Sequence, residues 1–130
     1  MVHKTSKDNT KMRAIPQKLK NELEQDTWYK RCCLTGRTRV QEKIEWHHAF
    51  AFAGRQINER WCILPLAKSI HDREKEREIK DRLNWIMLNR ADEETLKKYS
   101  KAIDLIWLKN SLNKQYGQWE PSSPYERYDI

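Results

Sequence analysis

Apolar and polar positions along the chain follow two different periods, and each period predicts a different kind of element. Over residues 16–31 the apolar positions have helical spacing, and the proline that opens this segment suits the first turn of a helix. Residues 38–46 (TRVQEKIEW) roughly alternate between apolar and polar, which predicts a strand that ends at His47. After a loop over residues 49–60, the apolar run WCILPL (61–66) predicts a second strand, with its proline near an end or an edge.

The second half of the chain predicts two longer helices. The first extends from about Ser69 to Asn89, and the mixed charges of residues 72–82 within it predict a solvated helix face. Asp92 or a neighbour is expected to cap the second helix, which continues to about Tyr116. Its inner side is expected to carry Leu96, Tyr99, Ile103, Ile106, Trp107 and Leu112. The order helix, strand, loop, strand, helix, helix predicts an α+β fold.

The length of 130 residues fits one domain, which we place at residues 15–117. Residues 1–14 predict a flexible basic arm, and residues 118–130, which contain two prolines, predict an irregular tail. Hydrophobic residues make up 38% of the chain and charged residues 35%, so the core must be small, although six tryptophans can bury large areas. No apolar run is long enough to cross a membrane and no leader opens the chain, so we expect a cytoplasmic protein without a membrane partner.

The charge balance favours a polyanionic partner. Lysine and arginine total 26 against 19 acidic residues, which gives a net charge of +7, and nucleic acid is the first candidate. The surplus is largest in residues 1–20, where six basic residues accompany a single acid, Asp8. This segment is compatible with a solubilising tail and equally with an arm that binds phosphates.

Three of the four histidines lie at predicted junctions between elements. His47 and His48 end the first strand, and His71 begins the helix that follows the second strand. A lone histidine is usually a core or surface residue, but in a hairpin followed by a helix these three positions converge on one cleft. Imidazoles gathered in this way can bind a divalent cation, so the pattern predicts a metal site.

These residues resemble a known family. The segments EWHHAFAFAGRQIN (45–58) and WCILPLAKSIHD (61–72) resemble the His-His, Asn, His signature of HNH endonucleases, and CCLTG (32–36) resembles the cysteine-containing turn that often opens that motif. The likeness is strongest over residues 32–72, and the flanking segments resemble the helices of small phage or prophage HNH proteins. It implies a ββα-metal core, a hairpin plus a helix, with flanking N- and C-terminal helices.

The resemblance also implies an activity, the metal-dependent hydrolysis of phosphodiester bonds in DNA, with RNA not excluded. His47 and His71 would be metal ligands, and His48 would be the general base that takes a proton from the attacking water. One divalent cation would neutralise charge on the phosphate and the leaving oxygen. Mg²⁺ or Mn²⁺ is expected in the bacterial host cell, and Ni²⁺ and Zn²⁺ are also compatible with imidazole ligands.

The asparagine of the motif has two candidate positions. Asn58 is the only asparagine between the histidines, and it would brace the loop and orient the base. The separation from His71 is longer than in many HNH proteins, and the commoner spacing falls on Cys62, whose thiol cannot replace an amide. Asn58 is therefore the expected catalytic partner of His48, and an ordinary loop residue is the alternative.

The cysteines argue against structural zinc. Many HNH proteins carry two CxxC pairs, but here Ala67 and Ile70 occupy the places expected for the second pair. Cys32, Cys33 and Cys62 form no CxxC pair and cannot all be paired in disulfides, which favours a reducing compartment. We therefore expect Cys33 and Cys62 to be small buried hydrophobic residues rather than ligands.

Arg55 and Lys68 are the basic residues expected to contact nucleic acid beside the cleft. Two rival functions remain. One is an HNH-like nucleic-acid-binding protein of phage origin that has lost its activity, and the other is a small helical regulator with a structural zinc site. Three histidines without a well-placed fourth ligand disfavour the second rival. The oligomeric state, the target sequence and the biological pathway do not follow from the sequence.

Overall fold

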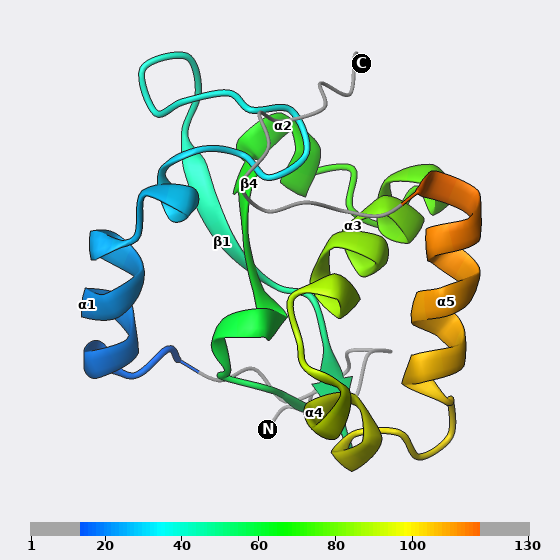
Figure 1. The fold of residues 1–130 in the computed structure, drawn as a ribbon. Coiled ribbons are helices and arrows are strands. Elements are labelled where there is room, and N and C mark those ends of the chain that lie inside the picture. The colour runs from blue at the N-terminus through cyan, green and yellow to red at the C-terminus, as the bar shows by residue number, and fades with distance from the viewer. Residues whose placement is uncertain (1–13, 118–130) are drawn as a thin grey trace, which may run out of the picture.

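The computed structural model describes residues 14–117 (Figure 1), so most of the predicted arm and the predicted tail, 1–13 and 118–130, lie outside the described residues. In chain order its helices and strands are α1 (Gln17–Gln25), the 3-10 helix η1 (Thr27–Lys30), β1 (Ile44–His48), β2 (Ala51–Phe52), β3 (Arg55–Gln56), the 3-10 helix η2 (Arg60–Cys62), β4 (Ile63–Ala67), α2 (Lys68–His71), α3 (Arg77–Asn89), α4 (Glu93–Lys98) and α5 (Leu105–Tyr116). Within these residues, no helix combines the length and the apolar character that crossing a membrane requires.

An antiparallel hairpin of β1 and β4 lies at the centre of the molecule. Helix α1 lies on one side of this hairpin, and α3 and α5 lie on the other (Figure 1). Every residue of β4 is buried, which explains why its sequence is a continuous apolar run rather than an alternating one. The predicted α+β fold is confirmed in this form, a two-stranded hairpin packed against helices.

Two groups of buried side chains cover the two faces of β4. Ile63 packs with Leu23 and Tyr29 in a small cluster beside α1. Leu64 and Leu66 belong to the larger cluster, which contains the buried side chains of α3, α4 and α5. Because successive side chains of a strand point to opposite faces, β4 joins the two clusters.

The first predicted helix and the first predicted strand are both shorter in the structure. Helix α1 ends at Gln25 because the extended backbone of Asp26 interrupts it, and the Asp26 carboxylate accepts a hydrogen bond from the N–H of Trp28 to begin η1. Strand β1 begins at Ile44 instead of residue 38. The preceding residues form a turn in which the Thr38 carbonyl accepts hydrogen bonds from two backbone N–H groups, and the Val40 side chain is 95% exposed.

The two long helices predicted for the second half are also divided. Helix α2 ends at His71, and the next residues form a turn before α3 begins at Arg77. Within this turn, Arg73 and Glu76 form a two-bond ion pair. The last predicted helix is interrupted between α4 and α5, where Asp104 caps the N-terminus of α5 by accepting hydrogen bonds from two backbone N–H groups.

This second interruption changes which residues face the core. Leu96, Tyr99 and Leu112 are buried as expected, but Ile103 is 55% exposed and Trp107 is 63% exposed. Because the chain turns between α4 and α5, the two helices do not share one continuous apolar stripe. The prediction that Ile103 and Trp107 face inward was therefore wrong.

Candidate metal centre

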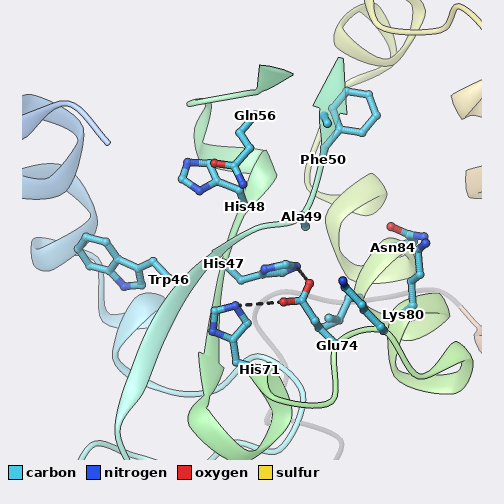
Figure 2. A pocket seen from close by; sticks show the side chains of 13 residues that line it. Trp46, His47, His48, Ala49, Phe50, Gln56, His71, Glu74, Lys80 and Asn84 are labelled. Atoms are coloured by element: carbon cyan, nitrogen blue, oxygen red, sulfur yellow. Dashed lines mark ion pairs between the residues drawn. The ribbon is translucent and has the colours of Figure 1, made fainter. Parts of the chain in front are cut away.

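A pocket of about 540 Å³ opens where the end of β1 meets α2, the following turn and α3 (Figure 2). Residues from these elements and from the β2–β3 segment line it: Trp46, His47, His48, Ala49, Phe50, Ala51, Gln56, His71, Glu74, Lys75, Lys80, Leu83 and Asn84. The three histidines that the sequence singles out therefore line one pocket.

Two of these histidines converge on a carboxylate. One Glu74 oxygen lies 3.5 Å from Nε2 of His47, and the other lies 3.3 Å from Nε2 of His71. Figure 2 shows both rings directed toward Glu74, and the ring centroids of the two histidines are 5.0 Å apart. One donor atom from each residue lies within 4.8 Å of the other two, so His47, His71 and Glu74 could hold a metal ion.

Glu45 holds the His71 ring in a fixed orientation. Its carboxylate lies 2.8 Å from Nδ1 of His71, and this contact lowers the pKa of Glu45. Because the carboxylate accepts the Nδ1 proton, we place the lone pair of the neutral ring on Nε2, the atom that faces Glu74. A carboxylate behind a histidine in this way orients the ring and raises its basicity toward a metal.

His47 is held in its neutral form. Burial, together with the nearby His71 and His48, lowers the pKa of His47 to about 4. A histidine must be unprotonated to bind a metal. His47 is therefore ready to act as a ligand across the neutral pH range.

His48 has a different partner. Its Nε2 lies 2.7 Å from Oδ1 of Asn58, and the Asn58 amide nitrogen donates a 3.0 Å hydrogen bond to the carbonyl of Ala14. The bond to Ala14 fixes which end of the amide faces His48, so the oxygen accepts from Nε2–H. We therefore assign the lone pair of His48 to Nδ1.

The loop before β1 fixes the short helix that carries His71. The Glu42 carboxylate accepts a 2.5 Å hydrogen bond from the backbone N–H of Ser69 at the start of α2. Arg37 binds the other oxygen of Glu42 at 2.9 Å and also donates to the Ser69 hydroxyl. These contacts attach α2 to the base of β1, and so they keep His71 opposite His47.

The basic residues of the pocket differ from those expected. Arg55, exposed at the β2–β3 hairpin, and Lys68, which forms an ion pair with Asp72 at 3.0 Å, are not among the residues that line the pocket. Lys75 and Lys80 line it instead, and Figure 2 shows Lys80 projecting from the side of α3. Within residues 14–117, neither lysine forms an ion pair with a carboxylate.

Sequence reasoning missed Glu74 and Glu45. Glu74 follows His71 by three residues, a spacing that suits two ligands of one ion, but it lies in a charged segment that favoured a solvated helix face. Glu45 precedes His47 by two residues, which places both on the same face of a strand. Both spacings were visible in the sequence.

The three cysteines lie in the core as free thiols. Burial raises the pKa of the Cys33 and Cys62 thiols, so these side chains stay protonated. Cys62 follows the buried Trp61 and contributes to the hydrophobic cluster beside the pocket. The expectation that Cys33 and Cys62 are buried hydrophobic residues is confirmed.

Comparison with known proteins adds no relative. The chain matches no family model, no curated protein and no solved structure.

Proposed function

We propose that this chain is a divalent-metal-dependent endonuclease of the HNH (ββα-metal) kind, and that it hydrolyses phosphodiester bonds in DNA. The observation that supports this most is the group formed by His47, His71 and Glu74 in the same pocket as His48. Three ligands beside an independently held histidine are the parts that metal-assisted hydrolysis requires.

The three donors suit one divalent cation. Two imidazole nitrogens and a carboxylate oxygen are compatible with Mn²⁺, Ni²⁺ and Zn²⁺, and the carboxylate together with substrate oxygens also suits Mg²⁺. When bound, the cation would neutralise negative charge on the phosphate and on the leaving oxygen. Because the donor group faces a pocket, it resembles a catalytic site with open positions more than a closed structural zinc site.

His48 takes the role of general base in this proposal. Asn58 occupies Nε2, so Nδ1 is the atom that accepts a proton from the attacking water. Asn58 acts as a positioning residue, since it holds the ring and its tautomer. Asn58 bridges His48 and the Ala14 carbonyl, whereas Cys62 is buried in the core, and this supports Asn58 as the asparagine of the motif.

Lys75 and Lys80 supply positive charge at the pocket. Their side chains are exposed, and they lie beyond Glu74 along the chain. A phosphodiester that enters the pocket brings negative charge next to Glu74, and the two lysines would offset that charge. A contact of Arg55 or Lys68 with nucleic acid outside the pocket stays a prediction.

A cleavage assay with the full-length chain tests the proposal. Supercoiled plasmid, linear duplex, branched DNA and RNA are incubated with EDTA or with Mg²⁺, Mn²⁺, Ni²⁺ or Zn²⁺. We expect cleavage of DNA with a divalent ion, none with EDTA, and none by the His47→Ala variant. DNA binding without cleavage under every condition would favour the inactive binding protein and would refute the endonuclease.

Matched lysine variants test which cations contact the phosphate. Lys80→Ala and Lys75→Ala should weaken binding and cleavage of DNA, whereas Lys68→Ala, at an exposed lysine outside the pocket, should change them little. The opposite result, with Lys68→Ala as the weaker binder, would place the nucleic acid on α2 and outside the pocket.

A further inference from the structure

A second, apolar pocket of about 410 Å³ adjoins the candidate metal centre. Its walls come from the β2–β3 hairpin, the end of α4 and the start of α5: Phe50, Ala51, Phe52, Ala53, Tyr99, Lys101, Ala102, Ile103 and Leu105. Phe50 and Ala51 line both pockets, and they follow His48 by two and three residues. A strand with a phosphate in the first pocket would therefore have a neighbouring nucleotide at the second.

We propose that this apolar pocket binds an unpaired nucleobase of the nucleic acid strand whose phosphate occupies the metal centre. The inference rests on the proposed function, because it takes the substrate to be a nucleic acid. It adds a substrate class. This is DNA in which a nucleotide next to the bond to be cut is already unpaired or leaves the base stack when the protein binds.

Aromatic rings form the wall of the pocket. The Phe52 and Tyr99 rings meet edge to face with centroids 5.0 Å apart, and Phe50 meets Tyr99 in the same way at 5.9 Å. Ile103 adds an exposed apolar side chain to this wall. Aromatic and aliphatic surface of this kind binds the faces of unpaired bases, and a base in a duplex cannot reach it without leaving the stack.

Glu59 holds this wall rigid from behind. Its carboxylate accepts hydrogen bonds from the Tyr99 hydroxyl and, at 2.9 Å, from the indole N–H of Trp61. The polar group of Tyr99 is thereby satisfied away from the pocket. A wall that is already fixed loses little conformational entropy when a base packs against it.

The hairpin turn fixes the position of Phe52. Ala53 and Gly54 have φ values of 54° and 76°, the positive values that a tight two-residue hairpin turn requires at both central positions. Phe52 pairs with Arg55 directly across this turn. A positive φ at an alanine is strained, and such strain is often found at binding sites.

Lysines beside the pocket favour a nucleotide over an uncharged apolar ligand. Lys101 lies 5.9 Å from the centre of the Phe52 ring, and Lys98 lies 5.3 Å from that of Tyr99. In the part of the chain that the structure describes, neither of them forms an ion pair with a carboxylate. Aromatic rings flanked by cations are the combination that binds single-stranded nucleic acid.

Fluorescence of a base analogue tests the proposal without any cleavage. The full-length chain in EDTA is titrated with a short single-stranded DNA that contains 2-aminopurine, and with the same DNA abasic at that position. We expect 2-aminopurine fluorescence to change on binding. Phe52→Ala should bind the base-containing DNA about tenfold more weakly. Phe52→Leu, which keeps an apolar side chain at the hairpin, should show the same direction of change.

The control is Trp107→Ala, which removes an exposed aromatic ring of α5 that does not line the pocket. It should bind the base-containing DNA with wild-type affinity. The abasic DNA should bind the wild type and Phe52→Ala equally. If Phe52→Ala, confirmed as folded by circular dichroism, binds the base-containing DNA as tightly as Trp107→Ala does, the base site is wrong.

Failure of this inference is distinguishable from failure of the nuclease. Metal-dependent cleavage that is lost in His47→Ala, together with unchanged base binding in Phe52→Ala, would leave the nuclease and remove the base site. Base binding that depends on Phe52, without cleavage under any metal, would leave the base site and remove the nuclease.

Discussion

His47 and His48 are adjacent on one strand, yet their surroundings differ in kind. His47 lies on the face of β1 that also carries Glu45, and it converges with His71 on the Glu74 carboxylate. His48 lies on the other face, beside Asn58, whose neutral amide accepts its ring proton. A ring directed at a carboxylate and at another imidazole suits a metal ligand, whereas a ring held by an amide keeps one nitrogen for proton transfer.

The alternation of a β-strand produces this difference. In the hairpin, His47 pairs with Leu64 and His48 pairs with Ile63, and these two residues of β4 belong to different buried clusters. One histidine therefore turns toward α2 and the other toward the start of the described chain at Ala14. Because neighbouring residues of a strand point to opposite faces, two identical side chains meet different surroundings.

The largest expected effect separates the two roles. His48→Ala should reduce cleavage by about 10²- to 10⁴-fold, because a positioned general base contributes on that scale. Metal affinity should remain close to wild type, since His48 is not one of the three donor residues. Isothermal titration with Mn²⁺ and a plasmid assay measure both quantities. A variant that loses metal as completely as His47→Ala would remove the distinction between the neighbours.

His71→Ala should instead lower metal affinity and activity together. Loss of the hydrogen-bond partner of a metal-binding histidine lowers metal affinity by roughly 10- to 100-fold. Loss of the ligand His71 itself should lower it by more. Titration calorimetry followed by cleavage over a range of metal concentrations measures both. An active variant with unchanged metal dependence would exclude His71 from the centre.

The pKa of His47 predicts a pH effect on the stability of the metal-free protein. The unfolded chain takes up this proton as the pH falls below 6.5, but the folded chain takes it up only near pH 4. The unfolded state thus binds more protons between these values. The free energy of unfolding should therefore decrease as the pH is lowered through this window, by at most about 3 kcal/mol. His47→Gln should lose this part of the slope in urea unfolding, while the two proteins should run parallel above pH 7. Equal slopes in the window would contradict the buried neutral imidazole.

Much of this contrast was visible in the sequence. The doublet at a strand end, the third histidine beyond a second apolar strand, and Asn58 between them predicted that these residues matter, and the structure gathers all three histidines in one pocket. The α+β class followed from the periods of the apolar positions, and the hairpin followed from the resemblance. These features depend on the local spacing of residue types, which can be read from a single sequence.

The missed features depend on tertiary structure. Residues 72–82 are good helix formers, so nothing local predicted the turn that lets Glu74 meet His47. The interruption between α4 and α5 likewise has no proline or glycine to signal it, and it exposes Trp107. Helix propensity is a weak guide where tertiary packing and capping determine the helix ends. At the second interruption, the Asp104 side chain caps α5.

Removing the carboxylate behind His71 should sharpen the contrast. Glu45→Gln keeps the size of the side chain but weakens the hold on Nδ1, so Mn²⁺ affinity should fall by about 10- to 100-fold. The adjacent exposed Lys43, which lies 3.5 Å from Glu45, supplies the control, and Lys43→Gln should bind Mn²⁺ nearly as the wild type does. Equal affinities for the two variants would mean that Glu45 does not orient the ligand.

The smallest effect on activity is expected when His48 is given a carboxylate partner, as His71 has in Glu45. Asn58→Asp replaces the amide oxygen at 2.7 Å by a carboxylate and removes the donor to the Ala14 carbonyl. An adjacent negative charge favours the charged imidazolium, and a protonated ring cannot act as a base. The acidic limb of the kcat/KM profile should therefore move to higher pH, by about one unit, which lowers activity on that limb by up to about tenfold. Activity should recover at higher pH.

Asn58→Ala, which removes the support without adding charge, should lose activity at every pH instead. If Asn58→Asp shows only such a uniform loss, the amide supports the loop but does not set the protonation of His48, and the contrast between the two histidines would rest on Glu74 alone.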